Sequence, residues 1–180
     1  YTGIPGTNIY ASYSYDFMAR RIRKNTSGRL LEYVYNNDDI IGLFIDGTLV
    51  AEFVHGLNVD EPLFTIQNEK AYYYHTGPIG TVLCITDETG QVVQRYSYNA
   101  WGKLLTQSGS FEFSVPENPG APLPDLLNTY TYTGREYDAE SSSYYYRKRN
   151  YIPEIGRFLQ MDPLQGQVDY PLTQNPYIYT

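Results

Sequence analysis

Short runs of strand-forming residues alternate with polar turn sequences along most of this chain. The runs are about six residues long and rich in Tyr, Val, Ile and Phe, as in residues 29–35, 40–45, 49–55, 70–75 and 91–98. Turn sequences recur roughly every 20 residues, and a second series recurs with the same period, displaced by about half. Successive turns are therefore expected at opposite edges of one sheet. The pattern predicts an all-β protein built as an antiparallel meander of hairpins.

The turn sequences support hairpins in particular. In residues 87–90 an Asp stands at the first position and a Gly at the fourth, which suits a type I turn with a left-handed residue that rejoins the ladder. The pair Asp46-Gly47 favours a tight hairpin in the same way. We therefore expect short connections between neighbouring strands.

Alternation within the strands indicates the environment of the sheet. In residues 92–99, the odd-numbered and the even-numbered positions both mix apolar and polar side chains. A conventional sandwich shows one apolar and one polar face. This pattern instead favours a single-layer, shell-like or open curved sheet with water on both surfaces.

A proline-rich stretch interrupts the meander. Residues 116–127 contain four prolines and a glycine, which remove ladder donors and hold the chain extended. We interpret the stretch as an insertion between two repeats. The predicted organisation is a repeat meander in residues 1–115, a loop in residues 116–128 and a third segment in residues 129–180.

Composition narrows the class of protein. The chain has 180 residues and 42% hydrophobic content, enough for one domain with a core. Its 21 tyrosines favour an all-β protein, because Tyr has a high strand propensity and keeps one polar end that can hydrogen-bond. A net charge of −7 argues against a nucleic-acid-binding surface. No apolar run approaches the ~20 residues of a membrane helix. The single Cys84 lies in an apolar run and is expected to be a buried small hydrophobe, so cysteine usage leaves the cellular compartment open.

Four ordered motifs resemble one known family. Residues 13–23, YSYDFMARRIR, and residues 96–104, YSYNAWGKL, resemble the repeat unit of RHS or YD-repeat proteins. Ala19 stands where that unit usually has Gly, which predicts a strained turn, and Asn99 replaces its Asp. Residues 54–82 resemble the segment before the RHS-associated core, and residues 132–163 resemble the core itself.

The resemblance implies a structural role. Such repeats form a β strip that spirals into a shell, which encloses a C-terminal toxin in secreted polymorphic toxins and toxin-complex C components. It implies a secreted or cell-surface location, no cofactor and no catalysis by the repeats. Because the chain begins at Tyr1 rather than Met and is too short to close a shell, we expect its partners to be the rest of one polypeptide or further copies, with a toxin as cargo.

The resemblance also supplies one candidate catalytic residue. Some family members cleave themselves with acidic residues near Asp-Pro motifs, and Asp162 precedes Pro163. Two carboxyl groups that share one proton can activate a water, and Asp169 is the candidate second carboxylate. The alternative is that Asp162 caps a turn.

Other polar residues have simpler interpretations. His55 and His75 lie 20 residues apart, so repetition rather than metal binding explains them. Residues 36–39, NNDD, lack the spacing of a calcium loop and are read as a solvated turn. Asn25 begins an Asn-Thr-Ser sequon in an expected exposed turn and is a candidate glycosylation site.

Three functions remain in competition. The favoured hypothesis is a non-catalytic segment of a shell that encloses or presents an effector. The first alternative is a self-assembling extracellular fibre or surface-adhesion subunit, in which open strand edges pair between copies. The second is an aspartyl autoprotease core centred on Asp162.

Overall fold

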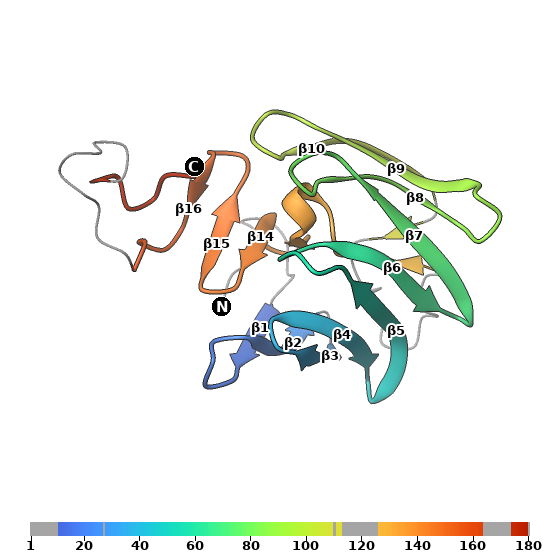
Figure 1. Ribbon diagram of the computed structural model, residues 1–180. Coiled ribbons are helices and arrows are strands. Elements are labelled where there is room, and N and C mark those ends of the chain that lie inside the picture. Colours follow the sequence, from blue (N-terminus) through green and yellow to red (C-terminus); the bar gives the residue numbers. More distant parts are fainter. Residues whose placement is uncertain (1–10, 27, 110, 113–125, 164–173, 180) are drawn as a thin grey trace.

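An antiparallel sheet forms the larger part of the molecule. The computed structural model describes residues 11–26, 28–109, 111–112, 126–163 and 174–179. Within these ranges, ten strands pair with their neighbours in sequence order (Figure 1). They are β1 (Ala11–Tyr15), β2 (Arg21–Thr26), β3 (Arg29–Asn36), β4 (Asp39–Ile45), β5 (Thr48–His55), β6 (Pro62–Gln67), β7 (Lys70–Thr76), β8 (Val82–Thr86), β9 (Val92–Tyr98) and β10 (Leu104–Gly109). The predicted all-β meander is confirmed.

Two smaller sheets follow in the chain. Strands β11 (Phe111–Glu112) and β12 (Leu126–Leu127) form a short parallel pair. A four-stranded antiparallel sheet contains β13 (Glu136–Asp138), β14 (Ser143–Tyr146), β15 (Arg149–Ile152) and β16 (Arg157–Phe158), and a single 3₁₀ turn, η1 (Tyr132–Gly134), precedes it. Most of the predicted proline-rich loop lies outside the described residues, and its last part contributes β12.

The hairpin turns lie on two opposite rims of the ten-stranded sheet. We call the turns that follow odd-numbered strands the odd rim; they are residues 16–20, 37–38, 56–61, 77–81 and 99–103. The turns that follow even-numbered strands form the even rim. In Figure 1 the odd rim faces left and the even rim faces right. The predicted alternation of turns between two edges is therefore confirmed.

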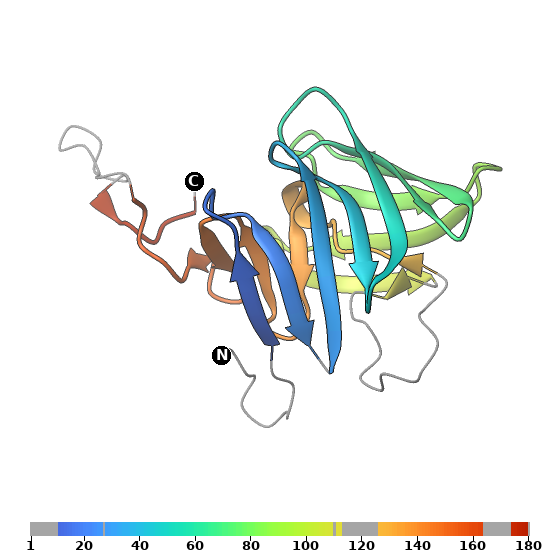
Figure 2. The same ribbon diagram turned by 90° about the horizontal axis from the view of Figure 1, so that it is seen from below.

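The sheet curves instead of lying flat. The pairing register shifts in each of the five hairpins that end at the odd rim. Such irregularities bend a strand and increase its twist. Figures 1 and 2 show the outcome: the meander curls around, and the four-stranded sheet lies in the opening between β1–β2 and β9–β10.

A shared side-chain hydrogen-bond pattern shapes three of the turns. Asp16 Oδ1 accepts bonds of 2.9 Å from the main-chain N–H groups two and four residues later. Asp87 and Asn99 make the same pair of bonds. An amide oxygen accepts these bonds as a carboxylate does, which explains why Asn99 can replace the usual Asp.

Ala19 has the strained left-handed backbone conformation that the sequence predicted for the first turn. Its φ is 63°, whereas Gly90 and Gly102 occupy the equivalent positions of the other two turns with φ of 82° and 79°. A Cβ in this conformation costs about 1–2 kcal/mol.

We expect Ala19→Gly to raise the free energy of unfolding by roughly 0.5–1 kcal/mol, because relief of strain exceeds the added entropy of the unfolded chain. Urea unfolding measures this change. Ala71→Gly, in β7 with ordinary backbone angles, is the control and should destabilise; equal losses in both variants would contradict the prediction.

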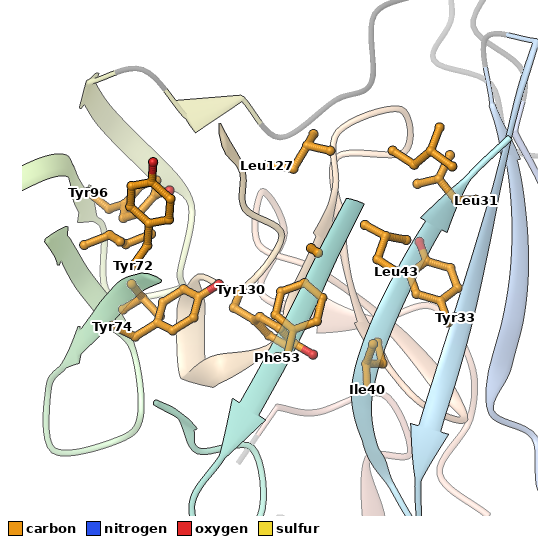
Figure 3. Packing of buried hydrophobic residues seen from close by; sticks show 14 residues of the cluster. Leu31, Tyr33, Ile40, Leu43, Phe53, Tyr72, Tyr74, Tyr96, Leu127 and Tyr130 are labelled. Carbon is orange, nitrogen blue, oxygen red and sulfur yellow. The ribbon is translucent and has the colours of Figure 1, made fainter. Parts of the chain in front are cut away.

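One face of the meander is buried, so the expectation of water on both surfaces is wrong. Buried side chains of β3, β4, β5, β7, β8 and β9 form a hydrophobic cluster, and the later residues Leu127 and Tyr130 belong to it. Tyr130 packs edge-on against Phe53 and Tyr74, at centroid distances of 5.3 and 6.1 Å (Figure 3). Residues 127–138 therefore cover a face whose tyrosines read as half-polar in the sequence. Their rings supply apolar area. The Tyr96 hydroxyl accepts a hydrogen bond from Asn128 Nδ2 at 2.9 Å, whereas the buried Tyr74 hydroxyl has no hydrogen-bond partner among the described residues.

A side chain anchors this covering segment at the β6 end. Gln67 Nε2 donates to the Leu127 carbonyl at 2.7 Å, and the Leu127 N–H donates to Gln67 Oε1 at 2.8 Å. The amide of Gln67 therefore imitates a strand partner and satisfies a buried stretch of main chain.

In the part of the chain described, no helix is long and apolar enough to cross a membrane.

Candidate functional site

The site of interest is the closure, which we define as the contact between β13–β15 and the two ends of the meander. Adjacent tyrosines of β14 face opposite ways, as the period of a strand requires. Tyr145 accepts a hydrogen bond from the Arg21 N–H at 2.9 Å and donates to the Ala19 carbonyl at 3.2 Å. Tyr144 donates to the Gly102 carbonyl at 2.7 Å. One strand thus binds the turns of the first and last hairpins of the ten-stranded sheet.

A buried ion network joins β13 to the N-terminal end. Arg21 Nη1 and Nη2 lie 2.6 Å from carboxylate oxygens of Asp138 and Glu136, respectively. Lys24 Nζ lies 2.9 Å from Asp138 and 2.6 Å from Glu140. All five side chains are at least nine-tenths buried. Buried charges of this kind are tolerated only as a mutually paired set.

Arg21 is also enclosed by aromatic rings. Its guanidinium carbon lies 4.4 Å from the ring centroid of Tyr145 and 5.2 Å from that of Tyr33. Tyr13, whose ring also faces Arg21, donates its hydroxyl to Glu140 at 2.9 Å. The rings exclude water from the network while their faces attract the cation.

The pKa values show how burial and pairing compete. Burial alone would lower the pKa of Arg21, but the carboxylates of Asp138 and Glu136 outweigh it, and the pKa lies well above its ordinary value. Burial likewise works against ionised Asp138, yet Arg21 and Lys24 hold its pKa below the usual range. For Glu136 burial wins and raises the pKa, although Arg21 opposes the shift. Asp138 is therefore the acidic centre of the network.

Aromatic residues join the four-stranded sheet to the C-terminal end of the meander. Tyr132 and Tyr151 donate to the carbonyls of Ala100 and Trp101, at 3.1 and 2.8 Å. Around these contacts lies a second cluster of buried aromatic residues, made of Tyr132, Tyr144, Tyr151 and Phe158. Gly102 has a φ of 79° and lies directly against the Tyr132 ring, where a side chain would not fit. Turn 99–103 is therefore bound through its main chain.

A second charged contact lies beside η1. Asp60 is 2.7 Å from Arg135 and 3.0 Å from Arg147. Burial raises the pKa of Asp60 and lowers the pKa of Arg135, although each residue partly offsets the other's shift. The neighbouring cavity has a volume of only about 30 Å³, which suits about one water molecule rather than an organic ligand.

Asp162 lies near the end of the described range 126–163 and contacts a basic side chain. It lies 2.7 Å from Arg149, and its N–H donates to the Pro176 carbonyl at 2.8 Å. Asp169 lies outside the described residues, so the proposed carboxylate pair stays a prediction. Within the described ranges, no group of three or more His, Cys, Asp or Glu side chains could hold a metal ion.

The two histidines are not equivalent, which corrects the expectation from their spacing. The His55 side chain is buried with Nε2 2.9 Å from the Ile40 carbonyl, whereas His75 is exposed on the other face and contacts Thr86 Oγ1 at 2.9 Å. The shifted register near the end of each strand breaks the simple repeat. Cys84 is half-buried rather than buried.

Asn25 is exposed but lies within β2 and not in a turn. Its glycosylation stays a prediction. Residues 36–39 form the end of β3, the turn and the start of β4, as expected for a solvated turn.

Sequence reasoning did not find the ion network. Arg21 and Lys24 occur in a strand that also holds exposed charges, and the acidic partners follow more than 110 residues later. The sequence did contain one indication: every second residue from Glu136 to Glu140 is acidic. This spacing places three carboxylates on one face of a strand and the turn after it.

The buried tyrosines predict a sharp loss of stability at alkaline pH. Burial raises the pKa of Tyr33 and of Tyr151 to about 12, above the ordinary value near 10. A phenol with a raised pKa stabilises the fold fully below pH ~10, and this contribution is lost as the pH rises toward 12, because the unfolded chain releases its protons first. We expect the phenolate absorbance of the buried tyrosines and the loss of the β-sheet circular dichroism signal to appear together in that window. Ionisation of all tyrosines while the β-sheet signal is intact would contradict the prediction.

The architecture and the closure together define a class of protein: a YD-repeat segment, in which repeated Asp- or Asn-initiated hairpins form a curved meander and a Tyr-rich segment closes it. The chain belongs to the Teneurin YD-shell family, whose model matches residues 5–178. The resemblance to RHS or YD repeats is confirmed.

Several relatives are far larger than this chain. The tRNA nuclease WapA of Bacillus subtilis strain 168 is 32% identical over 173 residues, covering 94% of this chain and 7% of that protein. Salivary gland surface protein 1 of Aedes aegypti is 32% identical over 149 residues, covering 80% of this chain and 4% of that protein. A chain in the structure of the Photorhabdus luminescens Tc holotoxin pore matches with a TM-score of 0.64 and 18% identity, covering 97% of this chain and 8% of that one. The chain therefore corresponds to a small part of such proteins.

Proposed function

We propose that this chain is a non-catalytic section of the wall of a large secreted or cell-surface YD-repeat protein, whose shell encloses or presents a C-terminal effector. The closure is the observation that supports the proposal most strongly. Strand β14 binds both ends of a curved ten-stranded sheet, and a buried set of paired charges holds the neighbouring strand β13 to the N-terminal end. These residues join sheets to one another, and such a structural role is expected of a wall.

Family membership supports the same function. Relatives named as a nuclease, a toxin and a surface protein share all or part of this segment, although their names describe different roles. A segment common to proteins of different activity fits a scaffold better than a catalyst. We also propose the three-part organisation described above, with residues 1–115 as meander, 116–128 as loop and 129–180 as closing core.

Limited proteolysis of a longer polypeptide tests the proposal. The polypeptide should carry the YD repeats that flank this chain and the region that follows it. We expect electron microscopy to show a closed particle and the following region to resist protease until the particle is opened with denaturant. An open strip whose following region is cut as fast as an unfolded control would overturn the proposal.

A self-assembling fibre is the second candidate, because the sheet has an edge strand whose outer side could pair with another copy. In the described part of the chain, β1 pairs only with β2, so its other side offers main-chain groups for strand pairing. Filaments that grow with the concentration of the 180-residue chain, measured by light scattering and microscopy, would favour the fibre over the wall.

Self-cleavage at Asp162 is the third candidate, and Asn25 glycosylation is a separate proposal. Intact mass after long incubation at mildly acidic pH tests cleavage, with Asp162→Asn as the control. An unchanged mass in both proteins would rule out the autoprotease hypothesis.

Glycosylation of Asn25 is tested by the intact mass after secretion from a glycosylating host, with Asn25→Gln for comparison.

A further inference from the structure

The two rims of the meander differ in chemistry. The even rim consists of polar residues and glycines at its described turns, such as Asp46-Gly47, Asn68-Glu69 and residues 87–91. The odd rim instead presents large apolar side chains to solvent: Phe17 is 97% exposed, Leu57 105%, Val59 74%, Ile79 63% and Trp101 54%. Exposed apolar groups gathered along one edge are typical of an interaction surface.

The odd rim also contains a groove. It lies between turns 56–61 and 77–81 and has a volume of about 450 Å³. Val59, Pro78 and Ile79 line one part of it, and polar residues, among them Asp60, Glu61 and the later residue Thr133, line the rest. Thr133 belongs to η1, which already packs on this rim: its N–H donates to Thr81 Oγ1 at 3.0 Å. The groove is therefore continuous with the contact between the meander and its own closing segment.

That internal contact shows how the odd rim binds a β layer. The tyrosines of the closing segment donate to main-chain carbonyls at turns 16–20 and 99–103. Glycines permit close approach, since Gly80 packs against the main chain of Thr133 and Gly102 against Tyr132. The covered parts of the odd rim are thus covered by β-rich chain of the same protein.

We propose that a second YD-repeat strip of the shell packs along the uncovered part of the odd rim and covers the exposed apolar side chains of turns 56–61 and 77–81. This inference rests on the proposed wall function and adds the surface through which neighbouring strips join. The exposed apolar residues drive the contact because their burial removes apolar surface from water.

Cysteine accessibility tests the inference. In a Cys84→Ser background, single variants place a thiol on the odd rim, Leu57→Cys or Ile79→Cys, or on the outer face of the sheet, Leu49→Cys or Ile41→Cys. Alkylation rates are measured in the 180-residue chain and in the longer polypeptide with its flanking repeats. The ratio of the two rates within one variant cancels differences in starting exposure.

We expect the odd-rim thiols to react at least tenfold more slowly in the longer polypeptide and the outer-face thiols to change less than twofold. Equal reactivity of the odd-rim thiols in a polypeptide that forms a closed particle would overturn the inference and leave the wall function standing. Protection that disappears when the enclosed C-terminal region is deleted would assign the odd rim to cargo and also overturn it. Absence of a closed particle would overturn the wall function itself.

Discussion

Replacing Asp138 by Asn is expected to lower the free energy of unfolding by about 3–5 kcal/mol. Asp138 is the shared partner of Arg21 and Lys24, at 2.6 and 2.9 Å, and all three side chains are almost fully buried. The amide carries no charge, so Arg21 and Lys24 each lose a charge-assisted bond worth about 1.5–3 kcal/mol, although Arg21 keeps Glu136 and Lys24 keeps Glu140. Urea unfolding followed by circular dichroism measures the loss.

A solvent-exposed pair in the same region provides the control. Arg23 and Glu32 lie 2.9 Å apart on the exposed face, in β2 and β3. Glu32→Gln should cost less than about 1 kcal/mol because water screens the pair. Similar losses in both variants would show that the buried network does not hold the closure.

The second large effect is expected at Gly134. An added Cβ would overlap the main-chain oxygen of Asp60, and φ at this position is 67°. Gly134→Ala therefore combines the cost of a left-handed alanine, about 1–2 kcal/mol, with that of an overpacked contact, about 1–3 kcal/mol. The overlap involves main chain, so rotation of a side chain cannot relieve it.

Gly47→Ala separates the two causes. Gly47 has a similar φ of 81°, but an added Cβ meets nothing within 4 Å. Only the conformational cost should appear there, so thermal unfolding should show a clearly larger fall in Tm for Gly134→Ala. Equal shifts would mean that η1 does not lie against turn 56–61 as closely as the geometry indicates.

The high tyrosine content has a physical explanation in the closure. A β layer that meets hairpin turns end-on encounters main-chain carbonyls that no strand satisfies. Tyrosine suits this position because its ring fills the gap between layers while its hydroxyl reaches the carbonyl, as Tyr144 and Tyr151 do. Phenylalanine would leave those carbonyls without a donor, at a cost of about 1–3 kcal/mol each.

The sequence could predict the features that depend on neighbouring residues. Turn residues at regular intervals and short aromatic runs between them predicted the hairpins, their order and the alternation of rims, because each hairpin forms from about 20 consecutive residues. The strain at Ala19 and the substitution at Asn99 were also readable, since a repeat unit shows which position takes φ above zero and which accepts the N–H groups.

The tertiary structure alone decided which face is buried and what holds the ends together. Tyrosine and glutamine read as half-polar in the sequence, and burial of their face depends on residues 127–138 returning across it. The pairing of Arg21 with Asp138 joins residues 117 positions apart, and no local pattern selects one distant carboxylate among 20 acidic residues. The repeated sequence pattern therefore determined the ten-stranded meander. Long-range charge pairing and aromatic packing determined how the two ends of the meander are joined.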